Sequence, residues 1–181
     1  MGDSITFGQH LAFGAQAWPA RIGAIGRGVC GETTRQALER WPRDVQENPA
    51  DITVIQYGHN DCNRWDTDRG LPRVSLEAFS ANLVEMVHRC RMFGTRPMLC
   101  TATPTSRRDD YDEDVAEYSA EVERVADRMD VPLIDVRTAF YSHRRGLGEL
   151  LMSDGVHLSP PGHQLYADTV QAALVRSLVA A

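Results

Sequence analysis

Ser4, Asp154 and His157 are the residues whose types and spacing could perform nucleophilic catalysis. A serine hydroxyl is a weak nucleophile and needs a base that takes its proton. Of the six histidines, only His157 has an aspartate three residues before it, in Asp154-Gly155-Val156-His157. In a turn-like loop, this spacing lets Asp154 accept a hydrogen bond from one imidazole nitrogen while the other nitrogen faces a hydroxyl. The three residues therefore predict acyl transfer through a serine nucleophile.

Acyl transfer also needs hydrogen-bond donors that face the negative charge developing on the carbonyl oxygen. The backbone N–H groups of Ser4 and Gly31 and the side-chain amide of Asn60 can supply three donors. Glycine at position 31 would let the backbone approach a ligand closely. Taken alone, the clusters 28–34 and 58–61 that hold Gly31 and Asn60 are also ordinary turns or strand ends. The prediction therefore depends on the joint occurrence of these clusters with the serine and the histidine.

The elements that must position these residues alternate along the chain. Four short apolar runs are predicted strands: 25–29, 52–57, 98–102 and 133–136. Helical periodicity begins near Leu76 and Val115, and a last helix follows Ser159, which can cap it with Pro160 at the first helical position. This alternation predicts the α/β class, with a parallel sheet between helices. Ligands of such sheets bind beyond the carboxyl ends of the strands, where the clusters 28–34 and 58–61 fall.

The four clusters, in this order, resemble the conserved blocks of the SGNH hydrolases, also called the GDSL esterase/lipase family. The resemblance extends from residue 2 to about residue 170. It implies that Ser4 of Gly2-Asp3-Ser4 is the nucleophile and that Asp154 and His157 complete a catalytic triad. It also implies that Gly31 and Asn60 join the Ser4 N–H in the oxyanion hole, and that the enzyme needs no cofactor and no metal.

The resemblance further implies a flavodoxin-like three-layer α/β/α sandwich with a parallel sheet, as one domain over residues 1–181. The sequence departs from the family pattern at its start. A hydrophobic strand normally precedes the nucleophile, whereas only three residues precede Ser4 here. The first strand is therefore expected to be missing or truncated. Either the native chain starts upstream of Met1, or another segment or subunit fills the gap, which makes a homo-oligomer one expectation.

The expected substrates are small acyl esters, of the acetyl type, on carbohydrate or other polar carriers. Two loops are predicted to overhang the site: 61–73, with Arg64 and Trp65, and 103–114, with Arg107. These three residues and His59 are candidate substrate-binding residues, although a solvated strand end is the ordinary interpretation of His59. An acyltransferase that passes the acyl group to an alcohol or a sugar would use the same triad, and the sequence does not separate it from a hydrolase.

The composition limits the partners. Lys and Arg total 19 against 25 Asp and Glu, which gives a formal net charge of −6 and argues against nucleic acid or an anionic membrane surface. No apolar run is long enough to span a bilayer, and the first residues lack the pattern of a signal peptide. The four cysteines have no zinc-ligand spacing, so we expect free thiols and a cytoplasmic location, unless the chain begins upstream of Met1.

The sequence leaves two rival functions open. Gly26-x-Gly28-x-x-Gly31 matches a dinucleotide-binding fingerprint, but a poor strand precedes it and no acidic residue ends the next strand. A metal hydrolase could use histidines and carboxylates, but the His-Glu-x-x-His spacing is absent. The candidate ligands of such a metal hydrolase are His59, Asp61, Asp154, His157 and His163. Both rivals leave the combination of Ser4 with His157 unexplained.

Overall fold

The centre of the structure is a parallel sheet of three strands in the order β1-β2-β3. The computed structural model describes residues 1–12, 14–107, 110–144 and 146–179. The strands are β1 (Ile52–Gln56), β2 (Arg96–Cys100) and β3 (Leu133–Ile134). β2 begins two residues before the predicted run 98–102, and its register pairs Ile52 of β1 with Arg96. The α/β sandwich predicted from the sequence is confirmed.

Helices connect the strands and cover both faces of the sheet. They are α1 (Ser4–Phe7), α2 (Trp18–Arg21), α3 (Thr34–Trp41), a π-helical turn (Pro42–Gln46), α4 (His59–Cys62), a 3-10 turn (Asp66–Asp68), α5 (Leu76–Met92), α6 (Tyr111–Met129), α7 (Val136–Tyr141), α8 (Leu147–Leu150) and α9 (Pro160–Val179). Ser159 accepts a hydrogen bond from the Gly162 N–H at 3.2 Å, so it caps α9 as predicted. Among the described residues, no helix combines the length and hydropathy needed to cross a membrane.

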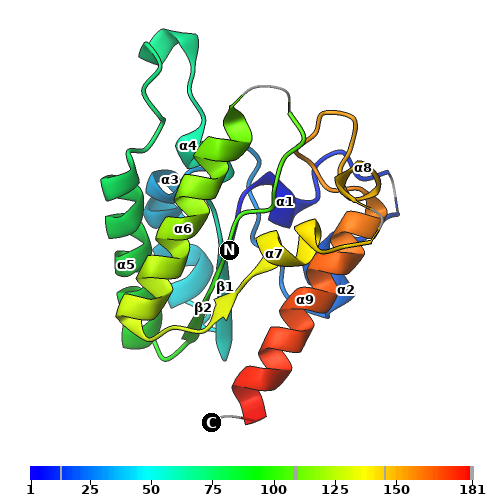
Figure 1. Cartoon of the computed structure of the whole chain (residues 1–181). Coiled ribbons are helices and arrows are strands. Elements are labelled where there is room, and N and C mark those ends of the chain that lie inside the picture. Colours follow the sequence, from blue (N-terminus) through cyan, green and yellow to red (C-terminus); the bar gives the residue numbers. More distant parts are fainter. Residues whose placement is uncertain (13, 108–109, 145, 180–181) are drawn as a thin grey trace.

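Two apolar cores hold the layers together (Figure 1). α3, α5 and α6 pack on one face of the sheet, where Phe79, Leu83 and Val122 are almost fully buried. α2, α7, α8 and α9 lie on the other side, around Phe140 and Tyr166. The helical spacing of these apolar residues gives each helix one face to bury, and that burial is the main force that fixes its position on the sheet.

The segment before Ser4 occupies a place within the sheet through two residues. Gly2 forms parallel bridges with Gly28 on one side and with Gln56 on the other. Met1 O accepts the Gln56 N–H at 3.1 Å, and Gly2 O accepts the Val29 N–H at 3.0 Å. The expected truncated first strand is thus a two-residue pairing, and the candidate strand 25–29 contributes only its bridge at Gly28. These bonds set Ser4 at the carboxyl edge of the sheet.

A cavity of about 420 Å³ continues the line of this pairing away from Ser4. Met1 closes one end, and the sides are formed by 52–54 of β1 and by 22–25 with Arg27. None of Ser4, Asp154 and His157 lines it, so it is separate from the residues predicted to do chemistry.

Candidate active site

The structure brings Ser4, His157 and Asp154 into one hydrogen-bonded line. Ser4 Oγ lies 3.0 Å from His157 Nε2, and His157 Nδ1 lies 2.7 Å from Asp154 Oδ2. Ser4 is 8% exposed, so its hydroxyl is sheltered but reachable. Residues 153 positions apart in the chain thus meet at the distances that proton transfer from a nucleophile to a base requires.

α1 holds Ser4 through contacts that the Gly-Asp-Ser sequence makes possible. Asp3 caps the helix, because its Oδ1 accepts the Ile5 N–H at 2.9 Å. Gly28 packs directly on the helix backbone: a Cβ at that position would come within 2.2 Å of the Phe7 nitrogen. Only glycine permits that approach. Gly28 therefore supports the helix that carries the nucleophile. This contact is separate from the role expected of Gly31 in the oxyanion hole.

The loop before α9 orients the imidazole. Asp154 Oδ1 accepts the backbone N–H groups of Val156 and His157, both at 2.9 Å, which leaves Oδ2 for the His157 ring. Met152 N–H donates to His157 O at 2.7 Å, and Ser106 N–H donates to Gly155 O at 2.9 Å. The local spacing thus presents one carboxylate oxygen to the backbone and the other to the imidazole.

Asp154 is ionised over the whole range in which esterases work. Burial alone would raise the pKa of its carboxyl, but the hydrogen bonds from Val156 N–H and from His157 outweigh burial and lower the pKa to about 2. A permanent negative charge beside His157 Nδ1 stabilises the imidazolium that forms when Nε2 accepts a proton. This arrangement favours His157 as the base and Asp154 as the residue that orients it.

The three groups predicted to be oxyanion donors lie at the start of α1, on α4 and in the turn before α3. Ser4 is the first residue of α1, so its N–H has no partner within the helix. Asn60 Nδ2 is buried without a hydrogen-bond partner among the described residues. Gly31 has φ +74°, a left-handed conformation that glycine adopts without strain. Asp61 anchors the turn after Gly31, since its Oδ1 accepts Thr34 N–H at 2.9 Å.

A cavity of about 410 Å³ opens over the serine at the carboxyl ends of β1 and β2. Its walls come from four segments that are distant in sequence. The lining residues are Ser4, His59, Asn60, Asn63, Arg107, Tyr111, Asp154, Val156 and His157. Most of these side chains are polar, and the Arg107 guanidinium lies 4.9 Å from the centre of the Tyr111 ring.

Of the four predicted substrate-binding residues, two line the cavity over Ser4 and two do not. His59 and Arg107 line the cavity over Ser4, as expected. Arg64 and Trp65 do not. Arg64 pairs with Asp114 at 2.9 Å, and Trp65 lies under the Arg73 guanidinium on the far side of the 61–73 loop, half exposed. Both residues are instead held by partners within the 61–73 loop and on α6.

His59 is buried rather than solvated, against the ordinary interpretation of its sequence position. It is 3% exposed, and its Nε2 lies 3.0 Å from Thr103 Oγ1. Burial, with a smaller contribution from the positive charge of Arg137, lowers the pKa of His59 to about 4. A neutral imidazole whose Nδ1 has no partner among the described residues therefore faces the cavity. Tyr111 holds the same segment through its hydroxyl, which donates to His59 O at 2.6 Å.

Tyr111 and Asn63 are lining residues that the sequence analysis missed. Tyr111 begins α6, and Asn63 follows α4. A tyrosine at a helix start and an asparagine after a short helix occur throughout proteins without function, so no local signal marks them. Their role in shaping the cavity depends on how α6 crosses the carboxyl end of β1.

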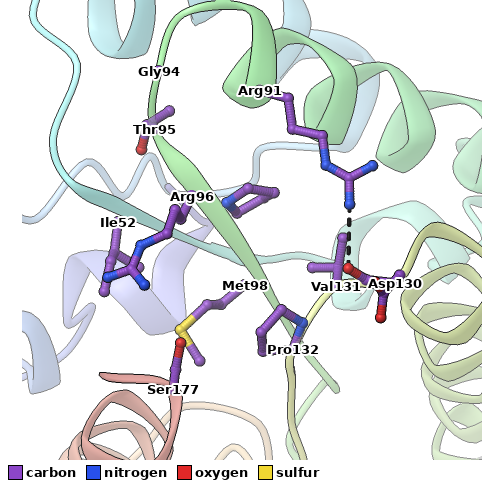
Figure 2. Close-up of a pocket in the computed structure, with 11 residues that line it drawn as sticks. Ile52, Arg91, Gly94, Thr95, Arg96, Met98, Asp130, Val131, Pro132 and Ser177 are labelled. Atoms are coloured by element: carbon purple, nitrogen blue, oxygen red, sulfur yellow. Dashed lines mark hydrogen bonds between the residues drawn. The ribbon is translucent and has the colours of Figure 1, made fainter. Parts of the chain in front are cut away.

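The candidate ligands of a metal hydrolase do not come together as a set among the described residues, and a second cavity lies apart from Ser4. A larger cavity, about 690 Å³, lies at the amino ends of the strands, between Ile52, Arg96, Met98 and Ser177 (Figure 2), and no Ser–His pair lines it. His163 accepts the Trp18 N–H through Nδ1 at 3.3 Å and is buried in the core. The imagined ligands His59, Asp61, Asp154, His157 and His163 thus do not gather at one point among the described residues.

A pH-dependent contribution to stability is expected from Asp3. Burial raises the pKa of its carboxyl to about 7, against the smaller, opposite effect of the Ile5 N–H. The folded state then keeps a proton that the unfolded chain releases near pH 4, so this group lowers the free energy of unfolding as the pH rises from about 4 to 7. Asp3→Asn keeps a capping oxygen but has no charge. We expect it to raise that free energy on the order of 2–4 kcal/mol at pH 8 and little at pH 4.

Urea denaturation of wild type and Asp3→Asn at both pH values tests this expectation. The exposed Asp127→Asn serves as the matched control and should change little at either pH. An equal gain from Asp3→Asn at pH 4 and pH 8 would contradict the explanation, because the gain would then not come from ionisation.

Comparisons with known proteins agree with this geometry. Residues 1–165 match the GDSL-like Lipase/Acylhydrolase family. The chain is 28% identical over 192 residues to the isoamyl acetate-hydrolyzing esterase 1 homolog of Mus musculus, covering 90% of this chain and 75% of that protein. It is 26% identical over 210 residues to the uncharacterized lipoprotein YqeF of Bacillus subtilis (strain 168), covering 94% and 86%.

A solved structure has the same fold. Axe2, an acetylxylan esterase from Geobacillus stearothermophilus, superposes with a TM-score of 0.80 at 23% identity, over 95% of this chain and 90% of that one. At this identity, the likeness is one of fold. It extends over nearly the whole chain, including the sheet edge at which Ser4 and Asn60 lie.

Proposed function

Because this chain belongs to the GDSL-like lipase/acylhydrolase family, we propose that it hydrolyses small acyl esters through an acyl-enzyme on Ser4. The chain is a carboxylic ester hydrolase of the serine type. The observation that carries the proposal is the line from Ser4 Oγ to His157 Nε2 at 3.0 Å and from His157 Nδ1 to Asp154 Oδ2 at 2.7 Å.

The first half of the proposed reaction forms the acyl-enzyme. Ser4 Oγ attacks the ester carbonyl while His157 Nε2 accepts the hydroxyl proton, and Asp154 stabilises the resulting imidazolium. The carbonyl oxygen becomes an oxyanion, which accepts hydrogen bonds from Ser4 N–H, Gly31 N–H and Asn60 Nδ2. As the tetrahedral intermediate collapses, the C–O bond to the alcohol breaks, and His157 returns its proton to the leaving oxygen.

The second half releases the acid. Water enters the place of the alcohol, and His157 Nε2 accepts one of its protons as the oxygen attacks the acyl carbon. The same three donors stabilise the second oxyanion. Collapse of this intermediate breaks the bond to Ser4 Oγ, which takes the proton back from His157, so serine and histidine return to their starting states.

The cavity favours a short acyl group on a polar carrier. Its volume is about 410 Å³, and its lining includes Asn63, Arg107, Tyr111 and the buried His59. A long alkyl chain would find few apolar side chains there, whereas sugar hydroxyls would find amide, guanidinium and phenol partners. Two similar proteins, an acetylxylan esterase and an isoamyl acetate-hydrolyzing esterase homolog, are named for acetyl esters, which supports the same preference.

A series of p-nitrophenyl esters from acetate to laurate, together with acetylated xylo-oligosaccharides, tests the preference. We expect kcat/KM to be highest for acetate and to fall steadily with chain length, and acetate to be released from the sugar. A variant that shortens Arg107, Arg107→Ala, should raise KM for the acetylated sugar more than for the aryl acetate. A preference for laurate over acetate would overturn the assignment of a short acyl group without affecting the serine mechanism.

A further inference from the structure

His10 lies beside the proposed triad although the reaction described above does not use it. Its Nε2 is 3.8 Å from Asp154 Oδ2, and its ring meets the His157 ring edge to face, with centroids 4.7 Å apart and planes at 86°. His10, Asp154 and His157 each offer one ligand atom, and these atoms lie within 4.8 Å of one another. Within the described parts of the chain, no other group of three such side chains is this compact.

The backbone holds His10 at this point. The residue follows α1 and has φ +69°, a left-handed conformation that is uncommon outside glycine. Gln9 N–H donates to Ser4 O at 3.1 Å, so the segment leaves the nucleophile's helix directly toward Asp154. The side chain is exposed, as is the Asp154 carboxylate, so an ion from solution can reach both.

Two imidazoles and a carboxylate are the ligand set that zinc prefers at sites with an open fourth position. Tetrahedral zinc with bonds of about 2.0–2.2 Å places its ligand atoms about 3.4 Å apart. The separation of His10 Nε2 from Asp154 Oδ2, 3.8 Å, and that of His157 Nδ1 from the same oxygen, 2.7 Å, lie on either side of this value. Small rotations of three partly exposed side chains would equalise them, and water would fill the fourth position.

We propose that His10, Asp154 and His157 form an inhibitory site for a divalent transition-metal ion, with zinc as the ion tested. Coordination uses the lone pair on His157 Nδ1, and a neutral imidazole that offers Nδ1 carries its proton on Nε2. That nitrogen can no longer accept the proton of Ser4 Oγ. The ion therefore stops the reaction by fixing the wrong tautomer of the base, and it also withdraws Asp154 from the imidazole.

The inhibition has a distinctive kinetic pattern. The ion binds on the Nδ1 side of His157, and Ser4 lies on the Nε2 side, 3.0 Å away. Substrate can therefore still enter the cavity over Ser4. We expect zinc to lower kcat with little change in KM, and added chelator to restore the rate fully. This inference rests on the proposed role of His157 as the base, so binding must also be measured apart from activity.

The test compares wild type with His10→Asn in titrations with zinc chloride. Asparagine tolerates the left-handed backbone at position 10 but removes the imidazole ligand. We expect the zinc concentration for half-inhibition to rise at least about tenfold in His10→Asn. His88→Asn, at an exposed histidine of α5, is the matched control and should keep the wild-type value. Cys30→Ser tests the exposed thiol as a different zinc ligand.

Calorimetric titration of zinc into Ser4→Ala gives the readout that does not depend on catalysis. One ion per chain is expected, with affinity lost in Ser4→Ala/His10→Asn. Equal inhibition of wild type and His10→Asn, or inhibition that disappears in Cys30→Ser, would overturn the metal site. A Ser4→Ala protein that still hydrolyses esters would instead overturn the proposed function, and the calorimetric result would remain valid.

Discussion

Ser4→Ala is expected to lose about a millionfold in kcat, the largest effect of any single substitution in this chain. The alanine removes the atom that forms the acyl bond, and no other hydroxyl among the described residues lies 3.0 Å from His157 Nε2. His157→Ala should cost about as much, and Ser4→Ala/His157→Ala little more than either alone, because the two residues act as one unit. The measurement is p-nitrophenyl acetate hydrolysis, corrected for the uncatalysed rate.

Ser142→Ala, at an exposed serine after α7, is the matched control and should retain full activity. The thermal midpoint of Ser4→Ala should stay near that of wild type, because the Ser4 hydroxyl hydrogen-bonds only to His157 among the described residues. Labelling with a fluorophosphonate should attach the probe to Ser4 in wild type and fail in His157→Ala. Activity of Ser4→Ala within tenfold of wild type would refute the serine mechanism.

Asn60→Ala is expected to lower kcat by about a hundredfold to a thousandfold with little change in KM. We expect this loss because Asn60 Nδ2 is buried and has no hydrogen-bond partner among the described residues. A buried donor normally has a hydrogen-bond partner, and leaving it without one is unfavourable. An oxyanion formed during the reaction would supply that partner, so the interaction strengthens in the transition state and raises kcat rather than affinity for the substrate.

Asn60→Ala should lower kcat without lowering the free energy of unfolding. Because Asn60 Nδ2 gives up no hydrogen bond on truncation, the free energy of unfolding should stay the same or rise slightly. Asn63→Ala, which truncates the same residue type in the wall of the same cavity, should reduce kcat far less. Comparable losses in Asn60→Ala and Asn63→Ala would show that the cavity wall, and not an oxyanion donor, is what the substitution disturbs.

The local parts of the site could be predicted from the sequence. Asp154 and His157 are three residues apart, and a turn at that spacing brings the Asp154 carboxylate to the His157 imidazole. The strands 52–57 and 98–102 were also readable, with errors of one or two residues at their ends, because continuous apolar runs must be buried on both faces.

Side chains of the loops could not be predicted in the same way. Arg64 and Trp65 have the chemistry of substrate-binding residues, but Asp114 and Arg73 hold them away from the serine. His59 was expected in solvent, and α6 with Tyr111 covers it. An exposed loop residue takes the partner that the fold brings near, and that partner is distant in sequence.

The α/β class and the family could be identified from the sequence, and the triad residues could be named as candidates, because apolar periodicity and short motifs are local properties. Only the tertiary structure decided that Met1 and Gly2 pair between two segments to set Ser4 at the sheet edge, and that His10 stands beside Asp154. It also decided that Asn60 Nδ2 is buried without a partner. The contacts span from 26 residues, for Gly2 with Gly28, to 144 residues, for His10 with Asp154, and no local pattern encodes contacts whose distances arise only when helices and strands pack together.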